Sequence, residues 1–274
     1  MTTEIDWLAV SARDSGNAQD PALLLLHGFT GSGSVWAALA AGLRRKGLRT
    51  IAPDLPGHGR AGVASDPASA SVERTAGDMA KLLAHLGAVP AGVLGYSLGA
   101  RIALRLAVAY PGVINRLLLE SPSAGIADPA VREARCRADD ELADAIERDG
   151  IEAFVDRWER NPVFASHAGV APRILAHQRE IRLRNSPHGL ALSLRQAGQG
   201  AMGPLHDRLG EIRIPTLVIV GALDPARPRA ELVAAGIPAA RLAVVPRSGH
   251  SPHLERPAAF RRLVTEFLQE GAAQ

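Results

Sequence analysis

The sequence predicts an α/β fold with a mostly parallel central sheet flanked by helices. Over residues 21–122, short apolar runs alternate with longer segments of helical periodicity, a pattern typical of βαβ units. The alternation stops after residue 122 and returns after Pro215, which indicates a helical insertion within a single α/β chain. With 274 residues, 47% of them hydrophobic, the chain is long enough to bury a large core.

Composition and charge exclude several classes of protein. The chain has one cysteine, Cys136, so disulfides do not hold it together, and a reducing compartment is compatible with it. The 31 Lys and Arg residues nearly balance 28 Asp and Glu residues and are scattered along the chain, which argues against a nucleic-acid-binding surface. The first residues, MTTEIDWLAV, contain no basic stretch, and no apolar run is long enough to span a membrane. We therefore expect no secretory signal, no integral membrane segment and a cytoplasmic location.

In the first part of the α/β core, each strand is expected at a short apolar run of the kind that a parallel sheet buries on both faces. These runs are 22–26, 50–53, 91–95 and 116–119. Between them, the apolar residues recur with helical spacing, which predicts helices at 35–45, 72–86 and 98–110.

Residues 123–203 are expected to form an all-helical lid, because this stretch has helix-like segments but no convincing strand. Residues 1–122 and 204–274 then form the two parts of one core. A separate helical domain is disfavoured, because the strands on either side would have too few partners to fold alone. After Pro215, strands are expected at 216–221 and 242–245, and helices at 228–235 and 257–270.

A catalytic triad is predicted at the carboxyl ends of three strands. The segment 95–99, GYSLG, fits the pattern G-x-S-x-G between a predicted strand and a predicted helix, where small residues permit a tight turn that exposes a serine hydroxyl. Asp224 and His250 each follow a later strand, so Ser97, Asp224 and His250 occur in the chain order serine, acid, histidine. His253 is the nearest alternative to His250, but it lies closer to the last helix and is more typical of a supporting histidine.

Two backbone amides are expected to form an oxyanion hole. His27-Gly28-Phe29 follows the first apolar strand, and Leu98 follows the predicted nucleophile, so the amides of Phe29 and Leu98 can converge. The side chain of His27 would point away from this hole, and we interpret it as structural. Residues 54–59, a cluster of turn-forming residues, are interpreted as scaffold.

Arg101 lies four residues after Ser97, one helical turn along the same face. This spacing predicts a guanidinium at the floor of the pocket. Because a buried arginine without a partner is costly, either an acidic side chain of the protein or an anionic substrate must satisfy it. The spacing does not decide between the two.

Several segments resemble a known family. HGF, DLPGHG, GYSLG, GALD and SGH, in this order and spacing, resemble the α/β-hydrolase fold over essentially the whole chain. The lid strings REARCRADDELA, VDRWERNPVF and RLRNSPHGLALSLRQAGQGAMGPL resemble one branch, the 2-succinyl-6-hydroxy-2,4-cyclohexadiene-1-carboxylate synthases, known as MenH; HGFTGS, GYSLGAR and SGHSPHLERP agree with it. GALDPAR keeps Asp224 but departs from the acidic-then-basic pattern common around it, and Ala100 replaces a frequent glycine.

The resemblance implies a carbon–oxygen lyase of menaquinone biosynthesis. Such an enzyme eliminates pyruvate from 2-succinyl-5-enolpyruvyl-6-hydroxy-3-cyclohexene-1-carboxylate, which carries three carboxylates. Ser97 would act as the base, activated by His250 and Asp224.

The resemblance also implies a set of substrate-binding residues: Tyr96, Arg101, Arg135, Trp158 and Arg184. A solvated helix face is the alternative interpretation of Arg135, and packing of the lid is that of Trp158. The expected partner is a small anionic substrate, and neither a metal nor an organic cofactor is expected. The sequence leaves the oligomeric state open.

Two other functions fit parts of the same sequence. A serine esterase or C–C-bond hydrolase of a small carboxylate-bearing substrate would use Ser97 as a nucleophile and would give an acyl-enzyme burst with activated esters. A catalytically inactive binding module is the third possibility. It is disfavoured because all three triad residues are present.

Overall fold

The computed structural model describes residues 13–62 and 66–270. Residues 1–12, the stretch in which the sequence predicts no secretory signal, lie outside these ranges, as do residues 63–65 and 271–274. In the part of the chain that the structure describes, no helix is both long and apolar enough to cross a membrane.

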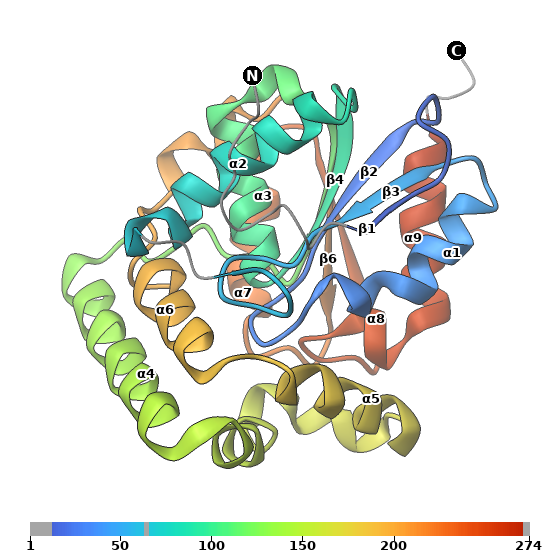
Figure 1. Ribbon diagram of the computed structural model, residues 1–274. Coiled ribbons are helices and arrows are strands. Elements are labelled where there is room, and N and C mark those ends of the chain that lie inside the picture. Colours follow the sequence, from blue (N-terminus) through green and yellow to red (C-terminus); the bar gives the residue numbers. More distant parts are fainter. Residues whose placement is uncertain (1–12, 63–65, 271–274) are drawn as a thin grey trace.

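A single sheet forms the centre of the molecule (Figure 1). Its strand order, within the described ranges, is β1-β3-β2-β4-β5-β6-β7, and every neighbouring pair is parallel except β1 with β3. The strands are β1 (Arg13–Ser15), β2 (Ala22–Leu26), β3 (Arg49–Ala52), β4 (Ala91–Tyr96), β5 (Ile114–Glu120), β6 (Thr216–Gly221) and β7 (Ala240–Val245). The predicted mostly parallel α/β fold is confirmed.

The largest differences from the predicted strands are in β1, β5 and β7; the prediction gave β5 as 116–119, three residues shorter than the strand observed. The prediction missed β1, because its sequence, Arg-Asp-Ser, has no apolar residue and only its pairing with β3 makes it a strand. It began β7 two residues late, at 242, because this edge strand is partly exposed and has no continuous buried run. An edge strand pairs on one side only and is less buried than a central strand, so its sequence has a weaker apolar pattern.

Helices cover both faces of the sheet (Figure 1). On one face lie α2 (Val72–His85), α3 (Leu98–Ala109) and α7 (Arg227–Gly236); on the other lie α1 (Ala37–Arg44), which the 3₁₀ turn η1 (Gly33–Trp36) precedes, the short α8 (Pro252–Glu255) and α9 (Pro257–Gln269). Strand β2 shows how the core is divided. Leu24 and Leu26 pack with the first layer, and Leu23 and Leu25 pack with the second, because successive strand residues point to opposite faces.

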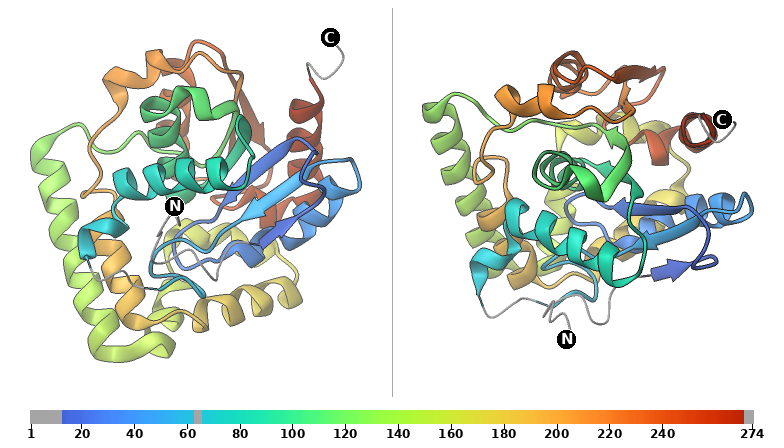
Figure 2. Two further views of the ribbon diagram at one scale, coloured as in Figure 1. Left: turned by 45° about the horizontal axis from the view of Figure 1, so that its top comes forward. Right: turned by 90° about the horizontal axis from the view of Figure 1, so that it is seen from above.

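Between β5 and β6 the described chain is helical without strands. We call α4 (Pro129–Trp158), η4 (Pro162–Gly169), α5 (Pro172–Leu183) and α6 (Pro187–Ala197) the helical insertion; the 3₁₀ turn η5 (His206–Glu211) follows it. Helix α4 runs along the outside of the molecule with α6 beside it (Figures 1 and 2). It is broken at Gly150, whose φ of 84° is costly for any residue with a Cβ.

The helical insertion docks onto loops at the carboxyl ends of the strands. Asn185 joins two of these loops, since its Oδ1 accepts from the Gly59 amide (2.8 Å) and its Nδ2 donates to the Thr30 carbonyl (2.9 Å). Gly57 and Gly189 approach so closely that a Cβ on either would overlap the backbone of the other. These contacts place the helical insertion over the edge of the sheet where the predicted catalytic residues lie.

Candidate active site

Ser97 lies on a sharp turn between β4 and α3. Its φ is 51° and its ψ is −103°, a strained conformation for a residue other than glycine. The flanking glycines are required by packing: a Cβ on Gly95 would overlap the carbonyl of Gly99, and a Cβ on Gly99 would overlap that of Leu26. The turn therefore holds the Ser97 hydroxyl at the carboxyl end of β4, as G-x-S-x-G predicts.

The structure brings Ser97, His250 and Asp224 together in one hydrogen-bonded chain. His250 Nε2 lies 3.1 Å from Ser97 Oγ, and His250 Nδ1 lies 2.9 Å from Asp224 Oδ2. Because an ionised carboxylate can only accept, Nδ1 of a neutral His250 carries the proton and Nε2 is free to accept from Ser97. This arrangement lets His250 take a proton from the serine.

Asp224 is held by two further donors. The Ser121 hydroxyl donates to its Oδ2 (2.8 Å), and the Ala226 amide donates to its Oδ1 (2.8 Å). Burial opposes the charged form of Asp224, but the hydrogen bond and charge of His250, with these two donors, hold its pKa below the ordinary value. Sequence reasoning missed Ser121, whose only signal is its position directly after β5.

The backbone amides of Phe29 and Leu98 are the predicted donors of the oxyanion hole. Phe29 and Leu98 both line the cavity that contains Ser97 and His250. Neither amide donates to a backbone carbonyl in the turns, loops and caps of the described residues. Gly28 is needed beside Phe29, because a Cβ there would collide with the Tyr96 ring. Both N–H groups are thus available to an oxygen anion near Ser97.

A cavity of about 240 Å³ lies between the core and the helical insertion. Core residues of the β4–α3 turn, of α7 and of the loops at Phe29 and His250 line it, together with residues of α4, η4 and α6 from the helical insertion. Its charged lining residues are Arg101, Arg135, Arg229 and Asp139, and its aromatic lining residues are Phe29, Tyr96, Trp158 and Phe164. The cavity combines apolar walls with a few polar groups, as small-molecule sites usually do.

Arg101 lies in the wall of this cavity, as its spacing from Ser97 predicts, and is only 7% exposed. Its Nη1 donates to the backbone carbonyls of Ala197 (2.6 Å) and Gly198 (3.1 Å), at the carboxyl end of α6. No acidic side chain of the described residues forms an ion pair with Arg101, and the helix-end carbonyls are its protein partners. Burial, and next the charge of Arg135, lower the pKa of Arg101 to about 10, so it is still a cation at neutral pH.

Arg135 and Arg229 bring two further guanidinium groups to the cavity. Arg135, on α4, is partly exposed, and its Nε donates to Asp139 Oδ1 (2.8 Å). Arg229, on α7, donates to Gln199 Oε1 (3.1 Å). Sequence reasoning missed Arg229; its only signal is that it stands in the first turn of the helix that follows Asp224.

Arg184 does not line the cavity, contrary to what the family resemblance implies. It follows the last residue of α5 and is exposed, whereas Arg182, two positions earlier, is buried. Residues two positions apart in a helix point to nearly opposite sides, so α5 cannot turn both side chains inward. Arg182 donates to Glu159 Oε1 (3.0 Å) and is held within the helical insertion.

Trp158 and Tyr96 form part of the aromatic wall. Trp158 contacts Phe29 and Phe164 edge to face, and its buried indole Nε1 has no hydrogen-bond partner among the described residues. Packing of the helical insertion and binding of a ligand acceptor are therefore both open to it. The Tyr96 hydroxyl lies 2.8 Å from Ser251 Oγ, and burial raises its pKa above the ordinary value. Tyr96 is thus a neutral wall residue beside His250.

The other histidines near the site have structural partners. His27 Nε2 accepts from the Leu55 amide (2.9 Å) and its Nδ1 donates to the Gly28 carbonyl (2.8 Å), which joins two loops of the scaffold. His253, the alternative to His250, is 2.9 Å from the buried Glu120 Oε1 through its Nδ1. Neither ring lines the cavity at Ser97.

Comparisons with known proteins show which proteins this chain resembles. The family model described as the alpha/beta hydrolase fold matches residues 21–257. A protein of Bacillus subtilis (strain 168) named "Putative 2-succinyl-6-hydroxy-2,4-cyclohexadiene-1-carboxylate synthase" is 36% identical over 267 residues, which are 97% of each chain. A protein of Serratia proteamaculans (strain 568) with that synthase name is 31% identical over 95% of this chain and 98% of its own. A solved structure, MenH from S. aureus, superposes with a TM-score of 0.91 at 31% identity, covering 95% of this chain and 98% of that one.

Proposed function

Since this chain belongs to the 2-succinyl-6-hydroxy-2,4-cyclohexadiene-1-carboxylate synthases of the α/β-hydrolase fold, we propose that it carries out their reaction in menaquinone biosynthesis. Pyruvate is eliminated from 2-succinyl-5-enolpyruvyl-6-hydroxy-3-cyclohexene-1-carboxylate, and a conjugated diene remains. One observation on this chain supports the proposal independently of its relatives' names. The hydrogen-bonded Ser97 and His250 open into a cavity that three guanidinium groups line.

The charge of the cavity supports an anionic substrate. Arg101, Arg135 and Arg229 face one lining carboxylate, Asp139, which is already paired with Arg135. The arginines thus outnumber the acid by two, and guanidinium groups bind carboxylates with well-defined geometry. A substrate with three carboxylates fits this surplus of positive charge.

In the proposed mechanism Ser97 is the base. His250, oriented by the ionised Asp224, accepts the Ser97 hydroxyl proton through Nε2 at 3.1 Å. The serine oxygen then removes the ring proton next to the succinyl ketone. The electron pair of that C–H bond forms a C=C bond to the ketone carbon, and the π pair of the C=O bond moves onto the ketone oxygen. No acyl-enzyme forms in this sequence.

The enolate oxygen lies against the Phe29 and Leu98 amides, each worth about 3 kcal/mol at such a site. When the enolate collapses, the ketone C=O re-forms, a ring double bond forms between carbons 2 and 3, and the double bond at carbons 3 and 4 moves to carbons 4 and 5. The C–O bond to the enolpyruvyl group breaks at carbon 5, and that group leaves as the enolate of pyruvate. The proton that Ser97 and His250 collected returns to the leaving group or to water, which balances the reaction. Arg101, Arg135 or Arg229 holds the departing carboxylate.

The test is a direct assay. The substrate is generated in situ, the protein is added, and pyruvate and diene are followed together, with Ser97→Ala as the inactive variant. Ser123→Ala is the matched control, because Ser123 is also buried after a parallel strand but donates only locally, to Gly125. Equal rates with and without the protein would contradict the proposal.

A serine esterase or C–C-bond hydrolase is the second candidate, since a hydrogen-bonded serine beside two free amides also suits acyl transfer. It predicts a burst with activated esters and covalent labelling of Ser97 that persists on the timescale of turnover. The lyase predicts slow, burst-free ester cleavage.

The remaining expectations belong to the same proposal. We propose that the partner is a small anion rather than a nucleic acid, because Arg101, Arg135 and Arg229 line a cavity of about 240 Å³, a size that suits a small molecule. A cytoplasmic location fits an enzyme of small-molecule biosynthesis. Cell fractionation of the host tests it, and recovery of the protein outside the cytoplasmic fraction would contradict it.

A further inference from the structure

A buried carboxylate holds the loop that carries His250. Glu255, the last residue of the short helix α8, accepts from the Gly249 amide through Oε2 (2.7 Å) and from the Ser251 amide through Oε1 (3.0 Å). These two amides belong to the residues immediately before and after His250. One side chain thus fixes the backbone on both sides of the histidine that is proposed to accept the Ser97 proton.

Glu255 has no cation to balance its charge. Its side chain is only 2% exposed, and no Lys or Arg among the described residues forms an ion pair with it. His167 Nε2, from η4 of the helical insertion, lies 3.9 Å from Glu255 Oε1, but burial lowers the pKa of His167 to about 4, so this ring is neutral at neutral pH. Burial of a carboxylate without a cation is costly, and the two amide hydrogen bonds are what offsets that cost.

Packing encloses the same loop from two sides. A Cβ on Gly249 would overlap the Ser166 hydroxyl of η4, and a Cβ on Gly221, at the end of β6, would overlap the carbonyl of Gly249. The backbone of the loop is therefore confined to one path. On this path, the two bonds to Glu255 fix the peptide planes and so set the direction in which the His250 ring leaves the backbone.

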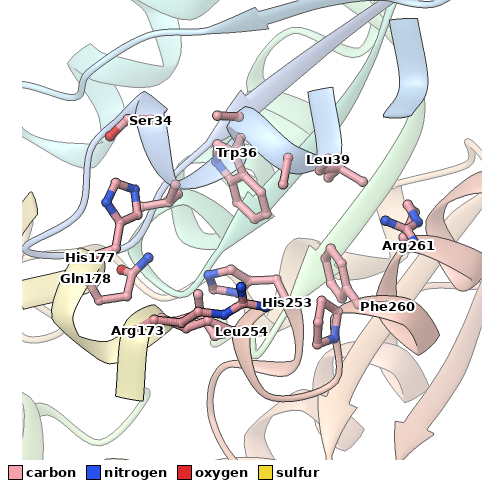
Figure 3. A pocket seen from close by; sticks show the side chains of 15 residues that line it. Ser34, Trp36, Leu39, Arg173, His177, Gln178, His253, Leu254, Phe260 and Arg261 are labelled. Atoms are coloured by element: carbon pink, nitrogen blue, oxygen red, sulfur yellow. The ribbon is translucent and has the colours of Figure 1, made fainter. Parts of the chain in front are cut away.

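Glu255 itself stays out of both neighbouring cavities. It does not line the cavity at Ser97. The two residues before it on α8, His253 and Leu254, line a separate cavity of about 410 Å³ (Figure 3), and Glu255 does not line that cavity either. Any effect of Glu255 on the reaction must therefore pass through the loop of His250 rather than through contact with the substrate.

From these contacts we propose that Glu255 is a positioning residue for His250, a role that rests on the proposed function of His250 as acceptor of the Ser97 proton. By holding the two loop amides, Glu255 keeps His250 Nε2 at 3.1 Å from Ser97 Oγ. Proton transfer requires this hydrogen-bond distance, and a misplacement of about 1 Å can cost about 100-fold in rate.

Glu255→Gln tests the proposal with almost no change in side-chain size. The new NH₂ group cannot accept a hydrogen bond, so one of the two loop amides loses its partner. We expect kcat of the lyase reaction to fall by about 10- to 100-fold and KM to stay within about twofold, because the cavity contacts are unchanged. Glu266→Gln, at an exposed position on α9, is the matched control and should keep the kinetics of the parent.

Labelling of Ser97 by a fluorophosphonate separates positioning from folding. The serine oxygen bonds to phosphorus and fluoride leaves, while the histidine takes the hydroxyl proton, so the rate constant reports the Ser97–His250 pair directly. We expect this rate constant to fall in Glu255→Gln by a factor similar to that in kcat. A purely structural role would lower the melting temperature and the fraction of protein that labels, but would leave the rate constant of the labelled fraction unchanged.

An unchanged labelling rate constant, or an unchanged kcat, in Glu255→Gln would overturn the proposal. The labelling also distinguishes the role of Glu255 from the lyase reaction. If the parent labels at Ser97 but does not eliminate pyruvate, the proposed function fails, and the labelling rates of parent and variant still decide the role of Glu255. If the parent does not label, His250 does not activate Ser97, and the positioning role is overturned.

Discussion

The guanidinium of Arg101, one helical turn after the predicted nucleophile, donates a hydrogen bond of 2.6 Å to the backbone carbonyl of Ala197, the last residue of α6. This bond joins the core helix α3 to the helical insertion at the wall of the candidate active site. One cation thus has two tasks, to hold the insertion in place and to give the cavity its positive charge.

Replacement of Arg101 should therefore be severe. We expect Arg101→Ala to lower kcat/KM of the lyase reaction by about 100-fold or more, because both the carbonyl contacts and a buried positive charge are lost. Arg105→Ala is the control, since Arg105, one turn further along α3, pairs with Glu73 outside the cavity. Unchanged kinetics in Arg101→Ala would contradict the model of three carboxylates bound by arginines.

Ser121 is expected to act by positioning Asp224. Ser121→Ala removes a 2.8 Å hydrogen bond to the carboxylate, which should lower kcat by about tenfold, with little change in KM. It should also allow the pKa of Asp224 to rise, so the acid limb of the pH–rate profile is expected to move to higher pH. A fall in stability with an unmoved profile would assign Ser121 a purely structural role.

The structure places Arg229 in the cavity wall, whereas the family resemblance implies Arg184 as a substrate-binding residue. We expect Arg229→Gln to raise KM by roughly tenfold, the effect of one lost charged hydrogen bond, whereas Arg227→Gln on the same helix should not, because Arg227 pairs with Glu231. The KM values of the purified variants test this prediction, and equal KM values in Arg229→Gln and Arg227→Gln would contradict it.

For Arg184→Ala we expect kcat/KM within about twofold of the parent, because this side chain is exposed and lies outside the cavity. A large rise in KM in this variant would show that the helical insertion closes further over a bound substrate. It would also restore the assignment that the family resemblance implies.

Two buried histidines should make the fold sensitive to acid. Burial lowers the pKa of His27 from 6.5 to about 4 and that of His58 from 6.5 to about 3. Both rings are neutral in the folded protein, so below pH 6.5 the unfolded chain binds protons that the folded chain does not. The free energy of unfolding therefore falls as the pH drops from 6.5 towards 4 for His27 and 3 for His58.

Denaturant unfolding at pH 7 and pH 5 measures this effect. Between these two pH values His58→Leu should lose about 2 kcal/mol less stability than the parent, because leucine cannot take a proton. His85→Gln, at an exposed position on α2, should keep the pH dependence of the parent. An equal loss in the parent and in His58→Leu would contradict the assignment of His58.

The sequence by itself determined those features that neighbouring residues encode. The alternation of apolar runs with helical periodicity identified the parallel sheet, because a buried strand and an amphipathic helix each have a local pattern. The strained turn at Ser97 could be predicted because Gly95 and Gly99 are the residues that tolerate its close approaches. Ser97, Asp224 and His250 each follow a predicted strand, and parallel strands end at one edge of the sheet. Their meeting at that edge could therefore be predicted from the sequence.

Only the tertiary structure decided which distant side chains meet. The carbonyl partners of Arg101 come from α6, Ser121 reaches Asp224 across 103 positions of sequence, and Arg229 enters the cavity while Arg184 does not. Strand β1 likewise exists because β3 offers it a partner. Such contacts depend on how the helical insertion and the loops pack over the sheet. No local sequence pattern encodes that packing, because an arginine has the same helix propensity whether its side chain faces the cavity or the solvent.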